Sequence, residues 1–309
     1  MRVPHHKLNP LPTRRDFVAL AAGAAAAAAP PVLAQDRVAV VATFSILGDL
    51  VKNVGGDRVA VATLVGPDGD VHVYSPTPAD AKTLTAAKAV FVNGLGLEGW
   101  MTRLIGASGS MAPVIVASAG VKPRDMPDRR QAGPVPDPHA WQSVANATIY
   151  VANIRDGLSR ADPAGKATYD ANAQSYLATL AALDEEVRAD VAKIPADRRK
   201  VITTHYAFGY FADAYGLQFI APEGLSTDAE PSAKDVAIII AQIRRDKIPA
   251  VFMENIADPR LMREIAGETG AAIGGTLYSD ALSAPDGPAG TYVALMRHNA
   301  GEFDKALTL

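Results

Sequence analysis

The chain has 309 residues, of which 49% are hydrophobic and 20% charged, and its formal net charge at pH 7 is −3. This length leaves room for two domains with a large buried core. The absence of cysteine excludes disulfides, thiolate metal sites, cysteine nucleophiles and lipid attachment at an N-terminal cysteine, so any chemistry must use histidine, carboxylate and hydroxyl groups.

Residues 1–34 have the pattern of an export signal. Residues 13–18 read TRRDFV, which is a twin-arginine motif, and an alanine-rich run and the possible cleavage site at residues 32–34 follow. The apolar run of roughly 13 residues is too short to span a membrane, which takes about 20. We therefore predict a periplasmic protein, exported by a twin-arginine signal that is then removed.

The mature chain is expected to be acidic. Removal of residues 1–34 takes away four basic residues (Arg2, Lys7, Arg14 and Arg15) and one acidic residue (Asp16), so the net charge changes from −3 to −6. An acidic exported protein without basic runs is a poor candidate for nucleic-acid binding. We expect a monomer that binds no nucleic acid.

From residue 37 to residue 158, short β-branched strands alternate with helices. The predicted strands are residues 37–43, 59–65, 89–93 and 113–117, and the predicted helices are residues 45–54, 78–88, 97–105 and 144–158. Residues 119–138 interrupt this alternation with five prolines, mixed charge and no periodicity. We predict a long surface loop there, of a length that is often functional.

One long helix is predicted from Asp162 to Ile194. Asp162 and Pro163 suit an N-cap and a first helical turn, and nothing interrupts the run before Pro195. A stripe of apolar and aromatic residues follows one face: Tyr169, Ala173, Tyr176, Leu177, Leu180, Leu183, Val187 and Val191. A helix of roughly 45–50 Å is long enough to join two domains.

Beyond the long helix the alternation resumes. Strands are predicted at residues 200–204, 217–221, 250–253 and 271–276, with helices ending at Tyr215, covering residues 232–247, starting at Asp258 and closing the chain. The predicted fold is α/β: two lobes, each with a mostly parallel sheet flanked by helices, joined by one spine helix. The predicted boundaries are residues 35–161 for the first lobe, 162–195 for the helix and 196–309 for the second lobe.

Three histidines follow predicted strands or the long loop. His72, His139 and His205 are roughly 65–75 positions apart, which matches no local metal motif, so spacing alone favours structural roles. Their placement favours a site, because ligands of parallel sheets bind beyond the carboxyl ends of the strands. His298 lies within the last predicted helix and is expected to be structural.

Carboxylates follow the same placement. Asp280 lies just past the last predicted strand and is the best candidate for a fourth ligand. Glu254 ends a strand and could accept a hydrogen bond from a ligand histidine, because such histidines usually donate their second ring N–H onward. Asp70 and Asp137 each precede a histidine by two residues, where turn formation is the simplest interpretation.

The sequence resembles a known family along essentially the whole mature chain. The motifs, in the family's order, are residues 41–49 (VATFSILGD), 70–78 (DVHVYSPTP), 93–100 (NGLGLEGW), 137–141 (DPHAW), 204–211 (THYAFGYF), 229–232 (AEPS) and 278–283 (YSDALS). They are similar to those of the periplasmic zinc- and manganese-binding proteins of ABC importers, the cluster A-I solute-binding proteins. The resemblance implies two lobes joined by one long helix, with a metal ion bound between them.

Carried over residue by residue, the resemblance implies the ligands His72, His139, His205 and Asp280. Three imidazoles and one carboxylate suit tetrahedral Zn²⁺, whereas Mn²⁺ favours more oxygen ligands. The manganese-type members carry a glutamate where His205 stands, which again favours Zn²⁺ over the alternative Mn²⁺. The chain departs from the zinc-type members in its loop, because residues 119–138 lack the histidine-rich insertion that those members often carry.

Three functions remain open at this point. The first is a transport protein that captures zinc in the periplasm and docks to a membrane ABC permease to release it. The second is a periplasmic zinc hydrolase, which would need an open coordination position for water and is supported by no catalytic motif. The third is a metal chaperone or adhesin that uses the same site. We expect the transport protein and no enzyme.

Overall fold

The structure, a computed structural model, describes Met1 and residues 37–127, 134–228 and 231–308. Residues 2–34 of the predicted export signal, including the twin-arginine motif, lie outside the described residues. No helix in the described part of the chain combines the length and the apolar character that crossing a membrane requires. We call residues 37–161 the first lobe and residues 196–308 the second lobe, because each contains its own four-stranded sheet.

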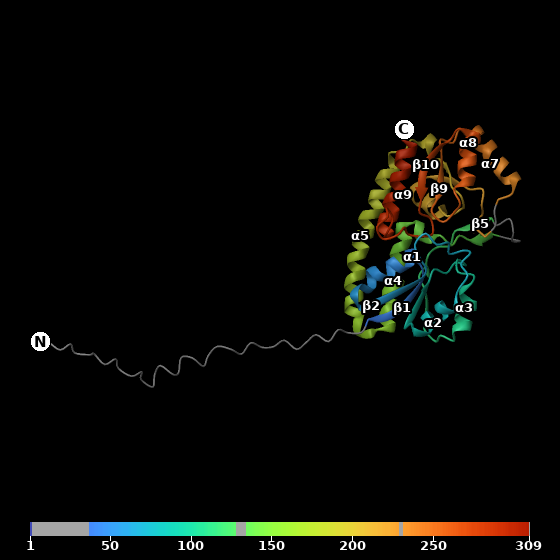
Figure 1. The fold of residues 1–309 in the computed structure, drawn as a ribbon. Coiled ribbons are helices and arrows are strands. Elements are labelled where there is room, and N and C mark those ends of the chain that lie inside the picture. The colour runs from blue at the N-terminus through green and yellow to red at the C-terminus, as the bar shows by residue number, and fades with distance from the viewer. Residues whose placement is uncertain (2–36, 128–133, 229–230, 309) are drawn as a thin grey trace. The chain divides into compact units, whose positions relative to one another are not determined.

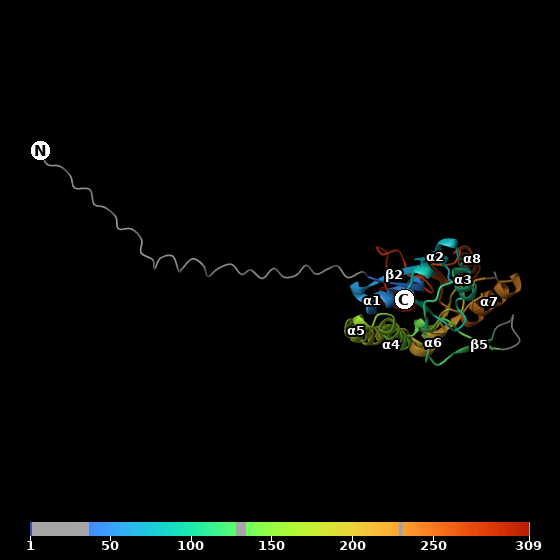
Figure 2. The ribbon, with the colours of Figure 1, turned by 90° about the horizontal axis from the view of Figure 1, so that it is seen from below.

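The first lobe contains a parallel sheet in the order β2-β1-β3-β4. The strands are β1 (Val38–Phe44), β2 (Val59–Val65), β3 (Ala89–Val92) and β4 (Val114–Val116). Helices α1 (Ser45–Gly55) and α4 (Val144–Ala161) lie on one side of the sheet and α2 (Pro78–Ala86) and α3 (Met101–Ser108) on the other (Figure 2). The four predicted strands are confirmed. Their sequences are continuous apolar runs because helices cover both faces of the sheet.

Helix α3 begins at Met101, whereas the sequence predicted a helix from Leu97. The carboxylate of Glu98 accepts hydrogen bonds from the backbone N–H groups of Asn93 (2.6 Å) and Gly94 (3.1 Å). These bonds fold residues 93–98 into a turn before the helix starts. The predicted helix start was wrong because Glu98 binds the backbone of the preceding turn instead of lying in the first turn of the helix.

The long loop of the first lobe has a short antiparallel ribbon at its base. Strands β5 (Asp125–Pro127) and β6 (Pro134–Pro136) pair with each other, so the prediction of a loop without regular structure was wrong at these residues. Proline occupies three of the six positions and donates no ladder hydrogen bond, which hid the ribbon in the sequence. Residues 128–133 between the strands, with Asp128, Arg129 and Arg130, lie outside the described residues.

Helix α5 (Lys166–Ala192) separates the two sheets in the sequence and runs beside both (Figure 1). It packs against α1 and α4 of the first lobe and against α9 (Tyr292–Leu307) of the second. The predicted stripe is confirmed: Leu177 is partly buried, and the other seven residues are buried. The start differs from the prediction, because a 3₁₀ turn covers Pro163–Gly165 and the carboxylate of Asp162 binds Arg58 and Tyr169 instead of capping the helix.

The second lobe contains a parallel sheet in the order β10-β9-β7-β8. Its strands are β7 (Lys200–Ile202), β8 (Gln218–Ile220), β9 (Ala250–Glu254) and β10 (Ala272–Leu277), and its other helices are α6 (Gly209–Tyr215), α7 (Ala233–Asp246) and α8 (Arg260–Thr269). Ser232 caps α7, as predicted, by accepting a hydrogen bond from the backbone N–H of Asp235. The predicted α/β class with two parallel sheets and a long helix is confirmed.

Candidate metal centre

The four predicted side chains come together in one cluster. Their potential ligand atoms all lie within 4.8 Å of one another. His72 follows β2, and His139 follows β4 after the long loop. His205 and Asp280 each lie three residues beyond the end of their strands, β7 and β10. Segments that follow parallel strands of both sheets therefore supply the cluster, with the ribbon of β5 and β6 lying between β4 and His139.

The three imidazole Nε2 atoms and the carboxylate of Asp280 point at one another. His72 Nε2 lies 3.2 Å from His139 Nε2 and 3.0 Å from Asp280 Oδ2. His205 Nε2 lies 3.1 Å from Asp280 Oδ2, and His139 Nε2 lies 3.7 Å from Asp280 Oδ1. Zinc–nitrogen bonds of about 2.0–2.1 Å place neighbouring tetrahedral ligands about 3.3–3.4 Å apart, and the observed separations lie around this value.

The cluster is buried and leaves one carboxylate oxygen without a hydrogen bond. The side chains of His139, His205 and Asp280 are fully buried, and that of His72 is 5% exposed. Asp280 Oδ1 has no hydrogen-bond partner in the part of the chain that the structure describes. A buried carboxylate oxygen without a partner is costly unless a cation lies beside it. These residues therefore fit a bound divalent metal ion.

Glu254 holds His205 from the side away from the cluster. Its Oε2 lies 2.6 Å from His205 Nδ1, and its Oε1 accepts hydrogen bonds from the backbone N–H groups of Thr204 (2.8 Å) and His205 (3.0 Å). A carboxylate at Nδ1 leaves Nε2 free to bind a metal ion and orients the ring. The Glu254 carboxylate therefore lies beside the ring in an ion-pair contact, while neither Nδ1 nor Oε2 has a hydrogen bond of regular geometry in the described residues.

Asp137 has the same relation to His139, which the sequence interpretation missed. Its Oδ1 lies 2.8 Å from His139 Nδ1 and also accepts a hydrogen bond from the backbone N–H of His139 (3.0 Å). Its Oδ2 lies 3.5 Å from Arg124 of the loop. Asp70 makes the equivalent turn contact to the backbone N–H of His72, but its other oxygen accepts a hydrogen bond from Thr227. The shared Asp-x-His spacing therefore gave no signal that separates the two aspartates.

The carboxylates determine the protonation of the cluster. Burial lowers the pKa of His139, but Asp280 and Asp137 outweigh it and raise the pKa to about 9. Burial likewise opposes the charged form of His205, while Glu254 and Asp280 raise its pKa well above the ordinary value. Burial favours neutral Asp280, yet His205 and His139 hold its pKa well below the usual range. Metal binding must therefore displace protons from the imidazoles.

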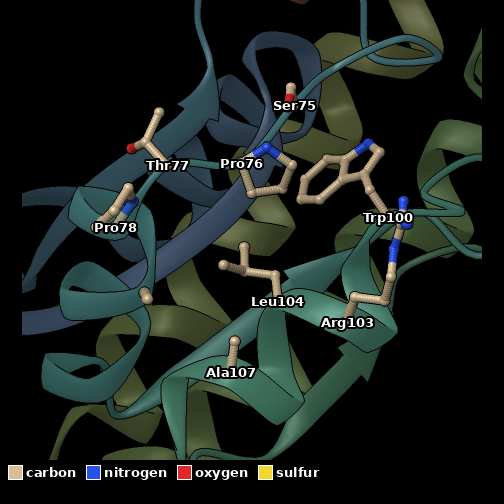
Figure 3. Close-up of a pocket in the computed structure, with 9 residues that line it drawn as sticks. Ser75, Pro76, Thr77, Pro78, Trp100, Arg103, Leu104 and Ala107 are labelled. Atoms are coloured by element: carbon tan, nitrogen blue, oxygen red, sulfur yellow. The ribbon is translucent and has the colours of Figure 1, made fainter.

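Two other features lie outside this cluster. His298 Nε2 donates a hydrogen bond to the carbonyl oxygen of Thr276 (2.9 Å), and its ring contacts that of Tyr278, so His298 is held within the second lobe. A groove of about 530 Å³ lies in the first lobe between the segment after His72 and helix α3 (Figure 3). It is lined by Ser75, Pro76, Thr77, Pro78, Ala81, Trp100, Arg103, Leu104 and Ala107, and by none of the four clustered side chains.

The chain is similar to known metal-binding proteins. A family model described as "Zinc-uptake complex component A periplasmic" matches residues 40–306. The iron-binding protein YfeA of Yersinia pestis is 35% identical over 280 residues, which cover 91% of this chain and 89% of that protein. The manganese ABC transporter substrate-binding lipoprotein PsaA of Streptococcus pneumoniae is 30% identical over 278 residues, which cover 88% and 89%.

Solved structures share the fold as well. The periplasmic zinc-binding protein TroA from Treponema pallidum superimposes with a TM-score of 0.83 at 30% sequence identity. The match covers 88% of this chain and all of that one (100%). The names of these relatives include iron, manganese and zinc, so the similarity extends across proteins named for different metals.

Proposed function

The chain belongs to the family of periplasmic zinc-uptake complex component A proteins, and we propose that it captures Zn²⁺ and delivers it to the membrane permease of an ABC importer. The family consists of metal-binding components of transporters, so the chain is a solute-binding protein and not an enzyme. The metal ion is then the cargo of the protein, which must bind it tightly and also release it.

The observation that carries the proposal is the convergence of three imidazole nitrogens and one carboxylate in a buried cluster. This donor set supports Zn²⁺, because neutral imidazoles suit zinc and Mn²⁺ prefers oxygen ligands. The names of the relatives do not decide between metals, whereas the donor type at His205 does favour zinc. A catalytic zinc ion would keep one position open for water, and four converging protein side chains speak against that arrangement.

A metal titration tests this function. The mature protein is stripped with a chelator and titrated with Zn²⁺ and Mn²⁺, beside the variants His205→Glu and His298→Gln. We expect one tightly bound Zn²⁺ that excess Mn²⁺ does not displace, a shift of preference toward Mn²⁺ in His205→Glu, and no change in His298→Gln. Comparable or tighter Mn²⁺ binding would refute the zinc assignment. Absence of stoichiometric binding of either metal would refute the function.

We also propose that residues 1–34 direct export through the twin-arginine route and that the mature protein acts as a monomer. Support for export comes from the sequence pattern and from relatives named as periplasmic or as ABC substrate-binding proteins. Replacing both Arg14 and Arg15 with lysine should retain the protein in the cytoplasm. Unchanged export of that variant would contradict the assigned route.

A further inference from the structure

Asp280 belongs to the second lobe in sequence, but the residues around it are bonded to the first lobe. The carbonyl oxygen of Ser279, directly before Asp280, accepts hydrogen bonds from Trp141 Nε1 (2.9 Å) and Gln142 Nε2 (2.7 Å). Trp141 and Gln142 are fully buried. The first lobe therefore fixes the backbone on the N-terminal side of Asp280.

The C-terminal side of Asp280 is bonded to the first lobe as well. The backbone N–H of Leu282 donates to Ser45 Oγ (2.9 Å), and the carbonyl oxygen of Leu282 accepts a hydrogen bond from the backbone N–H of Asp68 (2.9 Å). Further along, the backbone N–H of Tyr292 donates to Asp49 Oδ2 (2.9 Å). Ser45 and Asp49 belong to the motif of residues 41–49, to which the metal cluster itself gives no role.

The second lobe also makes hydrogen bonds to the segment around Asp280, beside the bonds from the first lobe. Asn299 bonds both backbone groups of Tyr278, and Asn255 Nδ2 lies 3.3 Å from the carbonyl oxygen of Ala281. The same Asn255 amide donates to Asp68 Oδ1 of the first lobe (2.9 Å). On either side of Asp280, Ser279 and Leu282 thus have first-lobe partners, while Ala281 between Asp280 and Leu282 is bonded to Asn255 of the second lobe.

His205 is held differently. Its backbone N–H and that of Thr204 donate to Glu254, and its carbonyl oxygen accepts a hydrogen bond from Thr203 Oγ1 (3.1 Å). The backbone N–H of the next residue, Tyr206, donates to the carbonyl oxygen of Gly224 (3.0 Å). All of these partners belong to the second lobe.

From this contrast we propose that Ser45 and Gln142 are positioning residues that hold Asp280 to the first lobe, so that His205 is the single metal-binding side chain carried by the second sheet alone. The inference rests on the proposed function and adds to it a division of the site: three side chains on one framework and one on the other. Separation of the two sheets would then remove His205 from the ion first, and release would begin there.

Double-mutant cycles test this assignment with Zn²⁺ as the only added metal. The variants Ser45→Ala and Gln142→Met remove one bond each and are combined separately with Asp280→Ala and with His205→Ala. Affinity is measured by competition with a chromophoric chelator. If Ser45 acts through Asp280, Ser45→Ala should weaken binding roughly tenfold in the wild type, within the range known for outer residues of metal sites. It should have no further effect when Asp280 is already alanine.

The two backgrounds distinguish positioning from a general loss of stability. In the His205→Ala background, Ser45→Ala should still weaken binding by the full factor, because Asp280 remains to be positioned. Ser110→Ala is the matched control. Like Ser45, Ser110 bonds a distant backbone group through its hydroxyl, but its partner, the carbonyl oxygen of Leu84 (2.9 Å), lies within the first lobe. This variant should leave the affinity unchanged. Gln142→Met repeats the test if the metal-free Ser45→Ala protein does not fold.

The outcomes separate this inference from the proposed function. Tight zinc binding by the wild type, with equal effects of Ser45→Ala in the Asp280→Ala and His205→Ala backgrounds, would overturn the inference and leave the function standing. No stoichiometric zinc binding by the wild type would instead refute the function. Loss of the Ser45→Ala effect only in the Asp280→Ala background would support both.

Discussion

The buried histidines of the cluster differ from His72 in how the ring is held. His139 and His205 each have a carboxylate at Nδ1, from Asp137 and Glu254, whereas the contacts of the His72 ring nitrogens in the described residues are those of Nε2 within the cluster. A carboxylate at Nδ1 orients the ring plane and keeps the remaining proton on Nδ1 once Nε2 gives up its own to a metal ion. Two of the three imidazoles are therefore prepared for a metal ion before it arrives.

Glu254→Gln should weaken zinc binding about 10- to 100-fold. The glutamine oxygen can still accept from the backbone N–H groups of residues 204 and 205, but its NH₂ group would face His205 Nδ1 and favour the tautomer that protonates Nε2. Chelator competition measures the affinity. Glu264→Gln on the exposed face of α8 is the control and should bind zinc like the wild type. Equal affinities for all three proteins would contradict this role of Glu254.

Zinc binding at pH 7 should release close to two protons. The pKa of His139 is about 9 and that of His205 lies well above its ordinary value. At pH 7 in the metal-free protein, both rings therefore carry a proton on each nitrogen and are positively charged. Zinc must displace these protons, and its affinity should therefore rise as the pH increases toward 9. Calorimetry in buffers of different ionisation enthalpy counts the protons. Release of no protons would show that the imidazole rings are already neutral in the metal-free protein.

The metal-free protein should become less stable in alkali. An imidazole whose pKa is raised in the folded state stabilises that state fully below the unfolded pKa of about 6.5, and the contribution is lost as the pH rises through the folded pKa. For His139 this window runs from about 6.5 to about 9. Thermal unfolding of chelator-treated protein should therefore show a falling Tm across this range. A constant or rising Tm would contradict the protonated cluster.

Placement in the sequence pointed to His72, His205, Asp280 and Glu254, because each lies at or after the end of a parallel strand, and to His139, because it follows the long loop. The resemblance to the family then implied the ligand set. Asp137 could not be selected in the same way. It precedes its histidine by two residues, as does Asp70, and only the path of the loop decides which carboxylate reaches a ring. Arg124 was likewise invisible, because its contact with Asp137 depends on the ribbon that brings it there.

The first residue of α6 leaves room for a carboxylate of the metal site. Gly209 begins α6, and a Cβ atom at this position would overlap Asp137 Oδ2 and the guanidinium of Arg124. Gly209→Ala should therefore displace Asp137 from His139 and lower zinc affinity. Gly267→Ala in α8 is the control, since nothing lies within 4 Å of its Cβ position. That change should leave affinity unaltered and raise stability by about 0.5–1 kcal/mol.

The long helix owes its position to its buried stripe, and its packing can be tested apart from the site. Leu183 is fully buried in the core that α5 shares with its neighbours. Leu183→Ala should lower the free energy of unfolding by about 2–5 kcal/mol, with little change in zinc affinity at temperatures where the protein is folded. Chemical denaturation gives the first quantity and chelator competition the second. A loss below about 1 kcal/mol would mean that this part of α5 is loosely packed.

The long helix and the strands of both sheets were predictable from their apolar patterns, whereas the ribbon and the start of α3 were not. The stripe on α5 and the buried strands of both sheets repeat often enough for the pattern to define their faces. Strands β5 and β6 have three residues each and are rich in proline, so no pattern could develop. The start of α3 depended on which backbone groups the Glu98 carboxylate binds, which is a tertiary choice.

At the scale of the whole molecule, α5 should restrict the movement between the lobes. It packs on α1 and α4 at one sheet and on α9 at the other, so a large hinge motion would have to break this packing. The absence of native cysteine permits spin labels at the exposed residues Lys52, Ala241 and Asp286. The distance between the labels at residues 52 and 286 should stay constant on zinc binding, because Leu282 and Tyr292 on either side of residue 286 are bonded to α1. The distance between the labels at residues 52 and 241 should change by only a few ångströms. A rotation of tens of degrees would contradict the rigid spine.

The distribution of the hydrophobic core has a consequence for cooperativity. One continuous cluster of buried residues runs from Val40 in the first lobe to Leu307 in the second, whereas a smaller cluster around Ile239, Ile243 and Met262 lies between the second sheet and helices α7 and α8. Residues that share a core unfold together, and a separate small cluster can open by itself. Calorimetry should therefore show one main transition for both lobes, and amide hydrogen exchange should be fastest, among the buried helices, in α7 and α8.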